Sequence, residues 1–200
     1  MVIDESLILP EFKKLFTVIF GFDQKEFEMF LSSFRIQNVP KKEFYLKAGD
    51  TCNNKAYLNK GCTRNFVVDE KGHERILFFG FEDWWLGDFD SYYSGNPATN
   101  YIQAIEDCEL IVISKSDFVS MEEKIPKLTQ WYKYKMARSA GASLRRTEEM
   151  KTQTPEIRYR NLVEKNPDII QRIPLQFIAA YLNIEPQSLS RIRKRLGEKD

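Results

Sequence analysis

Polar and basic side chains near the C-terminus have a spacing that places them together on one face of a helix. At about 100° per residue, Leu189, Ile192 and Leu196 fall on one side of residues 186–196. The opposite side carries amide, hydroxyl and cationic groups, namely Gln187, Ser190, Arg191, Lys194 and Arg195. An arginine can bridge two guanine acceptors, an amide can pair with adenine, and lysine and arginine neutralise phosphates. This face is therefore suited to the major groove of DNA.

The residues that precede this helix have the types that a helix-turn-helix requires. Ala179 is small at the point where a second helix must cross, and the apolar Ile178 and Leu182 flank it. Asn183 tolerates the left-handed backbone of a tight turn. Pro186 suits the first position of the second helix. The spacing predicts a helix-turn-helix whose second helix is the polar and basic one.

The distribution of charge separates this segment from the rest of the chain. The protein has 200 residues and a formal net charge of +1. Residues 151–200 hold 10 basic and 6 acidic side chains, whereas residues 1–150 hold 20 and 23. This asymmetry indicates a small segment that faces nucleic acid, attached to a larger body. The alternative is that Arg191–Arg195 is only a solvated run of charges, which the helix-turn-helix spacing disfavours.

The larger body has the pattern of short antiparallel strands. Residues 7–33 have helical spacing, and from about residue 34 to 113 the apolar residues alternate with a period of two. Two strands flank the turn at residues 69–72, which is a hairpin signal. Many short strands at near-regular spacing predict an antiparallel sandwich, roll or barrel. A short helix follows, with Ser116 or Asp117 as its expected cap.

Residues 127–150 form one long helical pattern that is rich in small residues. Ala137, Gly141 and Leu144 lie on one stripe, at positions i, i+4 and i+7. A glycine inside a helix costs about 1 kcal/mol relative to alanine, which is tolerable where another backbone approaches closely. We interpret the stripe as a contact between helices of two subunits. The alternative is a helix that lies on its own β-body. Residues 151–155 are interpreted as a linker.

A β-roll, a long helix rich in small residues and a helix-turn-helix, in this order, resemble the Crp/Fnr transcription regulators. The length and the run Ser188–Lys194 are similar to the Bacteroidetes-type branch. The resemblance implies an α+β fold, with an N-terminal antiparallel β-roll of the cyclic-nucleotide-binding-like jelly-roll type and flanking helices. A long dimerisation helix and a C-terminal helical DNA-binding domain would follow. The expected domains are the sensor at 1–125, the dimerisation helix at 126–150 and the helix-turn-helix domain at 151–200.

The resemblance also identifies a candidate effector pocket. In the family, an acidic residue after a glycine holds the ribose hydroxyl, and an arginine pairs with the cyclic phosphate. Here Gly87 matches the glycine, and Asp88 stands where glutamate is usual. Ala98 stands where the arginine is expected, and residues 95–101 contain no lysine or arginine. Burying a phosphate without a cation is costly, so cyclic AMP and cyclic GMP are not expected as tight ligands.

The effector is therefore unknown. The candidate pocket residues are Gly87, Asp88, Phe89, Ala98 and Thr99. A less anionic effector could use Trp84, Trp85, Tyr92 and Tyr93 as apolar walls; ordinary packing of these rings, and a sensor without a ligand, are the alternatives.

The same resemblance gives roles to residues of the DNA-reading helix. Arg191 matches the arginine that reads bases, and the hydroxyl of Ser188 lies where it can reach a phosphate. Pro186 and Gln187 stand where the family has Arg-Glu, so the family's operator sequence is not carried over. A homodimer would place two reading helices about one DNA turn apart on a roughly palindromic operator. RNA polymerase and a small-molecule effector are further candidate partners.

Other classes of protein fit the sequence less well. Cys52, Cys62 and Cys108 form no CxxC pair and are too few for an iron–sulfur cluster, and His73 is the only histidine, so no metal or cofactor is expected. No catalytic motif is present, which disfavours a cupin-type or other enzyme. A sensing or partner-binding module without specific DNA reading is the main alternative. No apolar run of about 18 residues exists, so we expect no membrane span and a cytoplasmic location.

Overall fold

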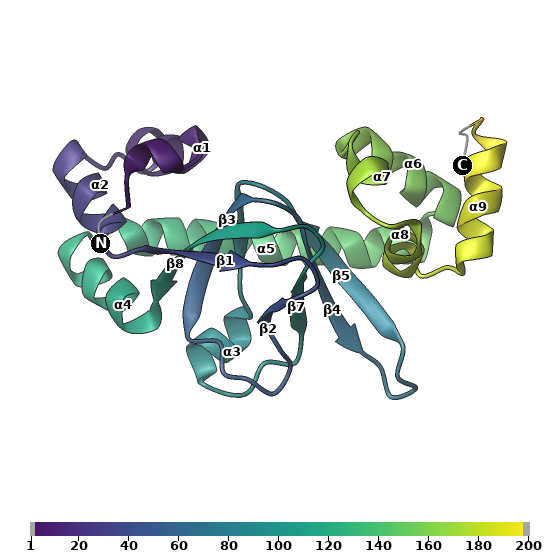
Figure 1. Ribbon diagram of the computed structural model, residues 1–200, viewed down its shortest axis with the longest axis horizontal. Helices are drawn as coiled ribbons and strands as arrows, with labels where there is room; N and C mark the ends of the chain where they lie inside the picture. Colours follow the sequence, from purple (N-terminus) through teal and green to yellow (C-terminus); the bar gives the residue numbers. More distant parts are fainter. Residues whose placement is uncertain (1–2, 198–200) are drawn as a thin grey trace. The chain divides into compact units, whose positions relative to one another are not determined.

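The computed structural model describes residues 3–197 (Figure 1). The chain divides into two compact units. The first contains the residues up to Asn65 together with Phe79–Arg138, and the second contains Phe66–Phe78 and the residues from Ser139 onward. One hairpin of the β-roll therefore belongs to the same compact unit as the C-terminal helices.

The β-roll consists of two four-stranded sheets in the described residues (Figure 1). The first sheet has the order β1-β8-β3-β6, formed by β1 (Arg35–Val39), β8 (Cys108–Ser114), β3 (Asn54–Lys60) and β6 (Trp84–Leu86). The second has the order β2-β7-β4-β5, formed by β2 (Phe44–Leu46), β7 (Tyr101–Ala104), β4 (Thr63–Val68) and β5 (Glu74–Gly80). Pairing is antiparallel between β1 and β8, β3 and β8, β3 and β6, and β2 and β7. The predicted antiparallel roll is confirmed.

Alternation along β3 separates two apolar cores. Ala56 and Leu58 belong to the core inside the roll, together with Ile102 and Leu110. Tyr57 points to the opposite face and belongs to a second core, which contains Phe12, Phe16, Phe27, Phe30 and Trp131. Because successive strand residues face opposite sides, one strand contributes to both cores.

The second core lies between the sheet and the flanking helices. These are η1 (Glu5–Leu7), α1 (Pro10–Lys14), the π-helical η2 (Leu15–Ile19), α2 (Gln24–Leu31), α4 (Lys115–Lys124) and the start of α5 (Lys127–Thr152). The helix α3 (Phe89–Ser94) instead contributes Tyr92 to the core inside the roll. α2 begins with a capping box, in which Asp23 and Glu26 each accept a hydrogen bond from the other's backbone N–H.

The cap predicted for α4 was wrong by two or three residues. Ser114 is the N-cap, and its hydroxyl accepts a hydrogen bond from the backbone N–H of Asp117 at 3.1 Å. Ser114 still has the extended backbone of β8, with ψ of 158°, which a capping residue needs. Ser116 and Asp117 lie inside the helix.

The second unit is helical apart from its hairpin. It contains the end of α5, α6 (Pro155–Lys165), α7 (Ile169–Arg172), α8 (Leu175–Leu182) and α9 (Pro186–Arg195). Its apolar interior includes Tyr159, Leu162, Ile169, Ile178 and Leu189. Thr154 caps α6. Because α5 continues to Thr152, the predicted linker at 151–155 is reduced to Gln153 and Thr154. Within residues 3–197, no helix is long and apolar enough to span a bilayer.

Candidate functional site

The helix-turn-helix has the local geometry that the sequence predicted. Ala179 and Leu182 of α8 are buried, and Asn183 adopts a left-handed conformation with φ of 55° and ψ of 48°. The backbone N–H of Ile184 donates to the carbonyl of Ala179 at 3.0 Å, which closes the turn. Pro186 then occupies the first turn of α9. The turn therefore sets the direction of the polar helix.

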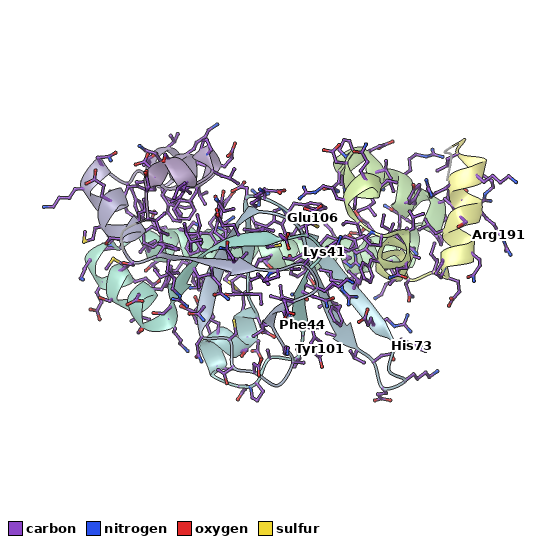
Figure 2. All side chains as sticks on the ribbon, in the orientation of Figure 1. Lys41, Phe44, His73, Tyr101, Glu106 and Arg191 are labelled. Atoms are coloured by element: carbon purple, nitrogen blue, oxygen red, sulfur yellow. The ribbon has the colours of Figure 1, made fainter. Side chains whose placement is uncertain are left out.

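One side of α9 is buried and the other is available to a partner. Leu189 and Ile192 pack into the interior of the second unit. The predicted DNA-facing side chains are exposed, except for the half-buried Ser188; the exposed ones are Gln187, Ser190, Arg191, Lys194 and Arg195. Arg191 projects from the outer side of α9 (Figure 2). Arg193, by contrast, is only 4% exposed, so the basic run is not a uniformly solvated face.

Four of these side chains line one open surface depression. Ser188, Arg191, Lys194 and Arg195 share it with Pro155, Ile184 and Ile192. Arg195 pairs with Glu156 at 2.9 Å. The side chains of Arg191 and Lys194 have neither an ion pair nor a hydrogen bond with another residue of the described part of the chain. Two cations are thus free to meet an anionic partner, while a third is held by a carboxylate.

Two arginines stabilise the end of α8. Arg146 donates to the carbonyls of Tyr181 at 2.9 Å and of Ile76 at 3.0 Å, and its guanidinium lies 3.7 Å from the centre of the Tyr181 ring. Arg158 donates to the carbonyl of Leu182 at 2.9 Å. The last carbonyls of a helix lack partners within the helix, and cations are favourable at this end. These contacts fix the helix that precedes α9.

The hairpin of β4 and β5 also contacts the turn before α9. Arg75 donates through Nη1 to Oδ1 of Asn183 at 2.6 Å and through Nε to Oδ2 of Asp69 at 2.9 Å. Asp69 closes the hairpin by accepting from the backbone N–H groups of Lys71 and His73. The hydrogen bond from His73, with further help from Arg75, lowers the pKa of Asp69. The sequence did not indicate this contact.

The candidate effector residues lie in the segment 87–99, which we call the candidate effector segment. Asp88 holds this segment together through hydrogen bonds. Its carboxylate accepts from the backbone N–H of Ser91 at 3.0 Å, which caps α3, and from that of Thr99 at 3.3 Å. Gly87 has φ of 153°, in the region that favours glycine. Phe89 is half-buried and Thr99 is exposed. Asp88 and Thr99 are therefore brought together as predicted, but both carboxylate oxygens of Asp88 already serve the backbone.

Ala98 is fixed by its backbone. It is 4% exposed, its N–H donates to the carbonyl of Asp50 at 2.8 Å, and its carbonyl accepts from Gly49 at 2.9 Å. Its methyl side chain supplies no charge to the segment.

A hydrogen-bonded pair of amides, from the buried Asn65 and the half-buried Asn100, was not found from the sequence. Asn100 donates through Nδ2 to Oδ1 of Asn65 at 3.2 Å, and Asn65 is 1% exposed. Nδ2 of Asn65, Oδ1 of Asn100 and Oγ1 of Thr63 are buried without a hydrogen-bond partner in the described part of the chain. A buried polar atom without a partner is costly, so these atoms are candidates for contact with a polar ligand.

The aromatic residues near Gly87 and Asp88 differ in burial: Tyr92 is buried, whereas Trp84 and Tyr93 are exposed. Trp85 packs in the second core, 4.7 Å from Trp131 and 5.9 Å from Phe12 between ring centres. Tyr93 contacts Tyr132 of α5 at 4.8 Å. For Trp85 the structure therefore favours the alternative of ordinary packing, because β6 directs its ring toward the helices and away from the interior of the roll.

The predicted dimer stripe lies on a little-covered part of α5. Ala137 is exposed, Gly141 is half-buried, and Leu144 is 72% exposed. The nearest atom to a Cβ built on Gly141 is Nη1 of Arg145 at 3.4 Å.

Comparisons with known proteins bear on the whole arrangement. Residues 36–124 match the family model of the cyclic nucleotide-binding domain. The "cAMP-activated global transcriptional regulator CRP" of Pasteurella multocida is 29% identical over 111 residues, which cover 56% of this chain and 53% of that protein. The resemblance to the Crp/Fnr family is confirmed. The chain spans about half the length of the Crp relatives that it matches in sequence.

Solved Crp/Fnr-type structures share the fold. The c-di-GMP responsive global regulator CLP of Xanthomonas campestris is 14% identical, with a TM-score of 0.70 over 88% of this chain and 92% of that one. FixK2 of Bradyrhizobium japonicum is 13% identical, with a TM-score of 0.72 over 82% and 84%. At these identities the likeness concerns the Crp/Fnr fold alone. The Bacteroidetes-type branch stays a prediction.

Proposed function

We propose that the protein is a sequence-specific, DNA-binding transcription regulator that acts as a homodimer. The observation that carries this proposal is the pair of free cations, Arg191 and Lys194, on the exposed side of a second helix in a helix-turn-helix. Exposed cations on that helix meet phosphates and base edges when the helix enters the major groove. The Crp/Fnr resemblance supports the same function.

The side chains of α9 divide into two roles. Arg191, Gln187 and Ser190 read base edges, because guanidinium, amide and hydroxyl groups match the hydrogen-bonding pattern of the major groove. Lys194 and Ser188 bind phosphates. Arg195 adds a phosphate contact only when its pairing with Glu156 is released.

The sensor does not use a cyclic nucleotide as a tight ligand. A cyclic phosphate needs a cation, and Ala98 supplies none. The carboxylate of Asp88 is engaged by the backbone N–H groups of Ser91 and Thr99, which leaves it less able to accept from a ribose hydroxyl. An uncharged effector is a better match, because the amides of Asn65 and Asn100 offer one buried donor atom and one buried acceptor atom without a net charge.

Dimerisation is assigned to α5, in the segment that carries Ala137, Gly141 and Leu144. An exposed leucine beside small residues lets two helices approach closely, and Leu144 is the largest apolar group of this stripe. Two-fold symmetry then requires a roughly palindromic operator. The proposal places the protein in the cytoplasm, with RNA polymerase as a further partner, and includes no catalytic step.

Capture of sheared DNA from the source genome tests this function. The purified protein is incubated with fragments at about 0.15 M salt, where surface charges are screened as in a cell. Arg191→Ala is the test variant, and Arg35→Ala, an exposed arginine of β1, is the control with the same change of charge. Discrete palindromic fragments should be enriched by the wild type and by the control and lost with Arg191→Ala. Recovery of random DNA only, by all three proteins, would overturn the proposal and favour a partner-binding module.

Sedimentation tests the dimer. The wild type should sediment as a dimer, and Leu144→Asp should shift it toward the monomer. The matched substitution Lys151→Asp, on the exposed end of the same helix, should leave the protein a dimer. A wild-type monomer at micromolar concentration would contradict the dimer.

A further inference from the structure

Lys55 is a buried lysine beneath three helices. It lies on β3 and is only 3% exposed. Its strand neighbour Ala56 faces the interior of the roll, whereas Tyr57 faces away from it and Lys55 faces the same way as Tyr57. A lysine is almost never fully buried without a partner for its charge.

Aromatic rings surround the amine of Lys55. They come from α3, α4 and α5, and the distances from Nζ to the ring centres are 3.5 Å to Phe118, 4.3 Å to Tyr92, 5.0 Å to Tyr93, 5.0 Å to Tyr132 and 5.9 Å to Trp131. Nζ also donates a hydrogen bond to the hydroxyl of Tyr93 at 2.7 Å. One side chain of the sheet therefore joins the helix of the effector segment to the helix that leads to the DNA-reading unit.

No carboxylate neutralises this amine at close range. Lys55 forms no ion pair with any residue of the described part of the chain. Burial lowers the pKa of Lys55 to about 7. Glu122 of α4 and Cys52 raise this pKa, and Lys115 lowers it further.

Two phenols and one thiol near the amine are neutral near pH 7. Burial raises the pKa values of Tyr92, Tyr93 and the Cys52 thiol, so none of these groups supplies a negative charge near pH 7. Tyr132 is the third phenol that faces Nζ. The aromatic faces attract the ammonium, which reduces the cost of burying the charge without removing it.

We propose that Lys55 is a proton-dependent latch that ties α3 to α4 and α5. The neutral amine stays in the aromatic cage and keeps the three helices together. Protonation favours an open arrangement in which the ammonium reaches water and α3 is released from α5, because a group with a lowered pKa in one state binds its proton more tightly in the other. This regulation goes beyond the proposed function and does not depend on DNA binding.

Nuclear magnetic resonance of the lysine side chains tests the proton itself. In ¹³C-labelled full-length protein, the Cε resonances are followed between pH 5.5 and about 11, since an unperturbed lysine titrates near 10.4. One resonance should titrate near pH 7 and be absent from Lys55→Met. A Lys55 resonance that titrates near 10 would overturn the latch.

Tryptophan fluorescence tests the release of the helices, because Trp131 is part of the cage. The wild type should show a transition with the same midpoint as the Lys55 resonance, and Lys55→Met should show none. Lys55→Arg, which stays charged at every pH used, should also lack the fluorescence transition. This variant replaces Lys55→Met in the experiment if the methionine variant does not fold. His73→Gln should retain the transition, since the side chain of His73, the sole histidine, is 62% exposed on the hairpin.

Substitutions of two charged residues near Lys55 should shift the midpoint of the pH transition in opposite directions. Lys115→Met removes a repulsion and should raise the midpoint, whereas Glu122→Gln removes an attraction and should lower it. An unchanged transition in Lys55→Met and in Lys55→Arg would overturn the proposal.

Discussion

Arg75 donates a hydrogen bond of 2.6 Å from Nη1 to Oδ1 of Asn183, the left-handed residue of the turn between α8 and α9. The two residues are 108 positions apart in the chain. Asn183 thus has two separate roles. Its backbone adopts the positive φ that the turn requires, and its side chain accepts a hydrogen bond from Arg75 of the β4–β5 hairpin. The turn before α9 is therefore tied to the β4–β5 hairpin of the β-roll.

Substitutions of Asn183 separate these two roles. Asn183→Ala loses the hydrogen bond and also places an alanine at a φ of 55°, which costs about 1 kcal/mol or more in free energy of unfolding. Asn183→Gly loses only the hydrogen bond, because glycine adopts this conformation without strain. Urea denaturation should therefore find the alanine variant clearly less stable than the glycine variant. Equal stabilities would show that the left-handed backbone is not required.

The helix-turn-helix was predictable because its signals are local. Asn183 and Pro186 occupy positions where only a few residue types fit, and each was placed correctly without reference to distant residues. The hairpin at 69–72 was predictable for the same reason. By contrast, the contact between Arg75 and Asn183 depends on the folded arrangement of distant segments, which no local pattern contains.

The candidate effector segment was predictable only in part. The resemblance aligned Gly87 and Asp88, but it did not show that the backbone occupies the carboxylate of Asp88. The burial of Lys55 on β3 could not be predicted from the sequence, because a lysine in a strand normally points to solvent. The cap of α4 was misplaced because Ser114, Ser116 and Asp117 all have side chains that can cap a helix.

Cyclic nucleotides should fail to bind the sensor tightly. Calorimetric titration with cyclic AMP, and separately with cyclic GMP, is expected to show no binding at micromolar concentration, because Ala98 leaves the cyclic phosphate without a cation. A micromolar dissociation constant for either nucleotide would contradict the account of the pocket.

Glu156 should weaken the binding of DNA. Its carboxylate pairs with Arg195 at 2.9 Å. Glu156→Gln should free this guanidinium, tighten binding to random DNA and increase the salt dependence by up to about one phosphate contact, a slope change of about 0.9. Glu164→Gln, an exposed glutamate on the same helix, makes the same change of charge and serves as the control in a fluorescence anisotropy titration. If both variants tighten binding equally, the pairing has no specific effect.

Lys55 should make stability rise with pH above neutrality. Its pKa is about 7 in the folded protein and near 10.4 in an unfolded chain, so the unfolded state binds more protons between these values. The free energy of unfolding should therefore gain up to about 1.4 kcal/mol per pH unit in this window from this group. Urea denaturation from pH 7 to about 10 should show a shallower rise in Lys55→Met than in Lys60→Met, which removes an exposed lysine from the same strand. Equal slopes would mean that Lys55 is not titrating as the structure indicates.

The central claim is that α9 reads bases through Arg191 and holds the backbone through Lys194. The most direct test is to measure the affinity of each alanine variant for an enriched fragment and for random DNA over a range of salt concentrations. Arg191→Ala should lose about 1–3 kcal/mol on the enriched fragment and much less on random DNA, whereas Lys194→Ala should weaken both and reduce the salt slope by about 1. Equal losses on both DNAs for Arg191→Ala would contradict the claim that this residue reads bases.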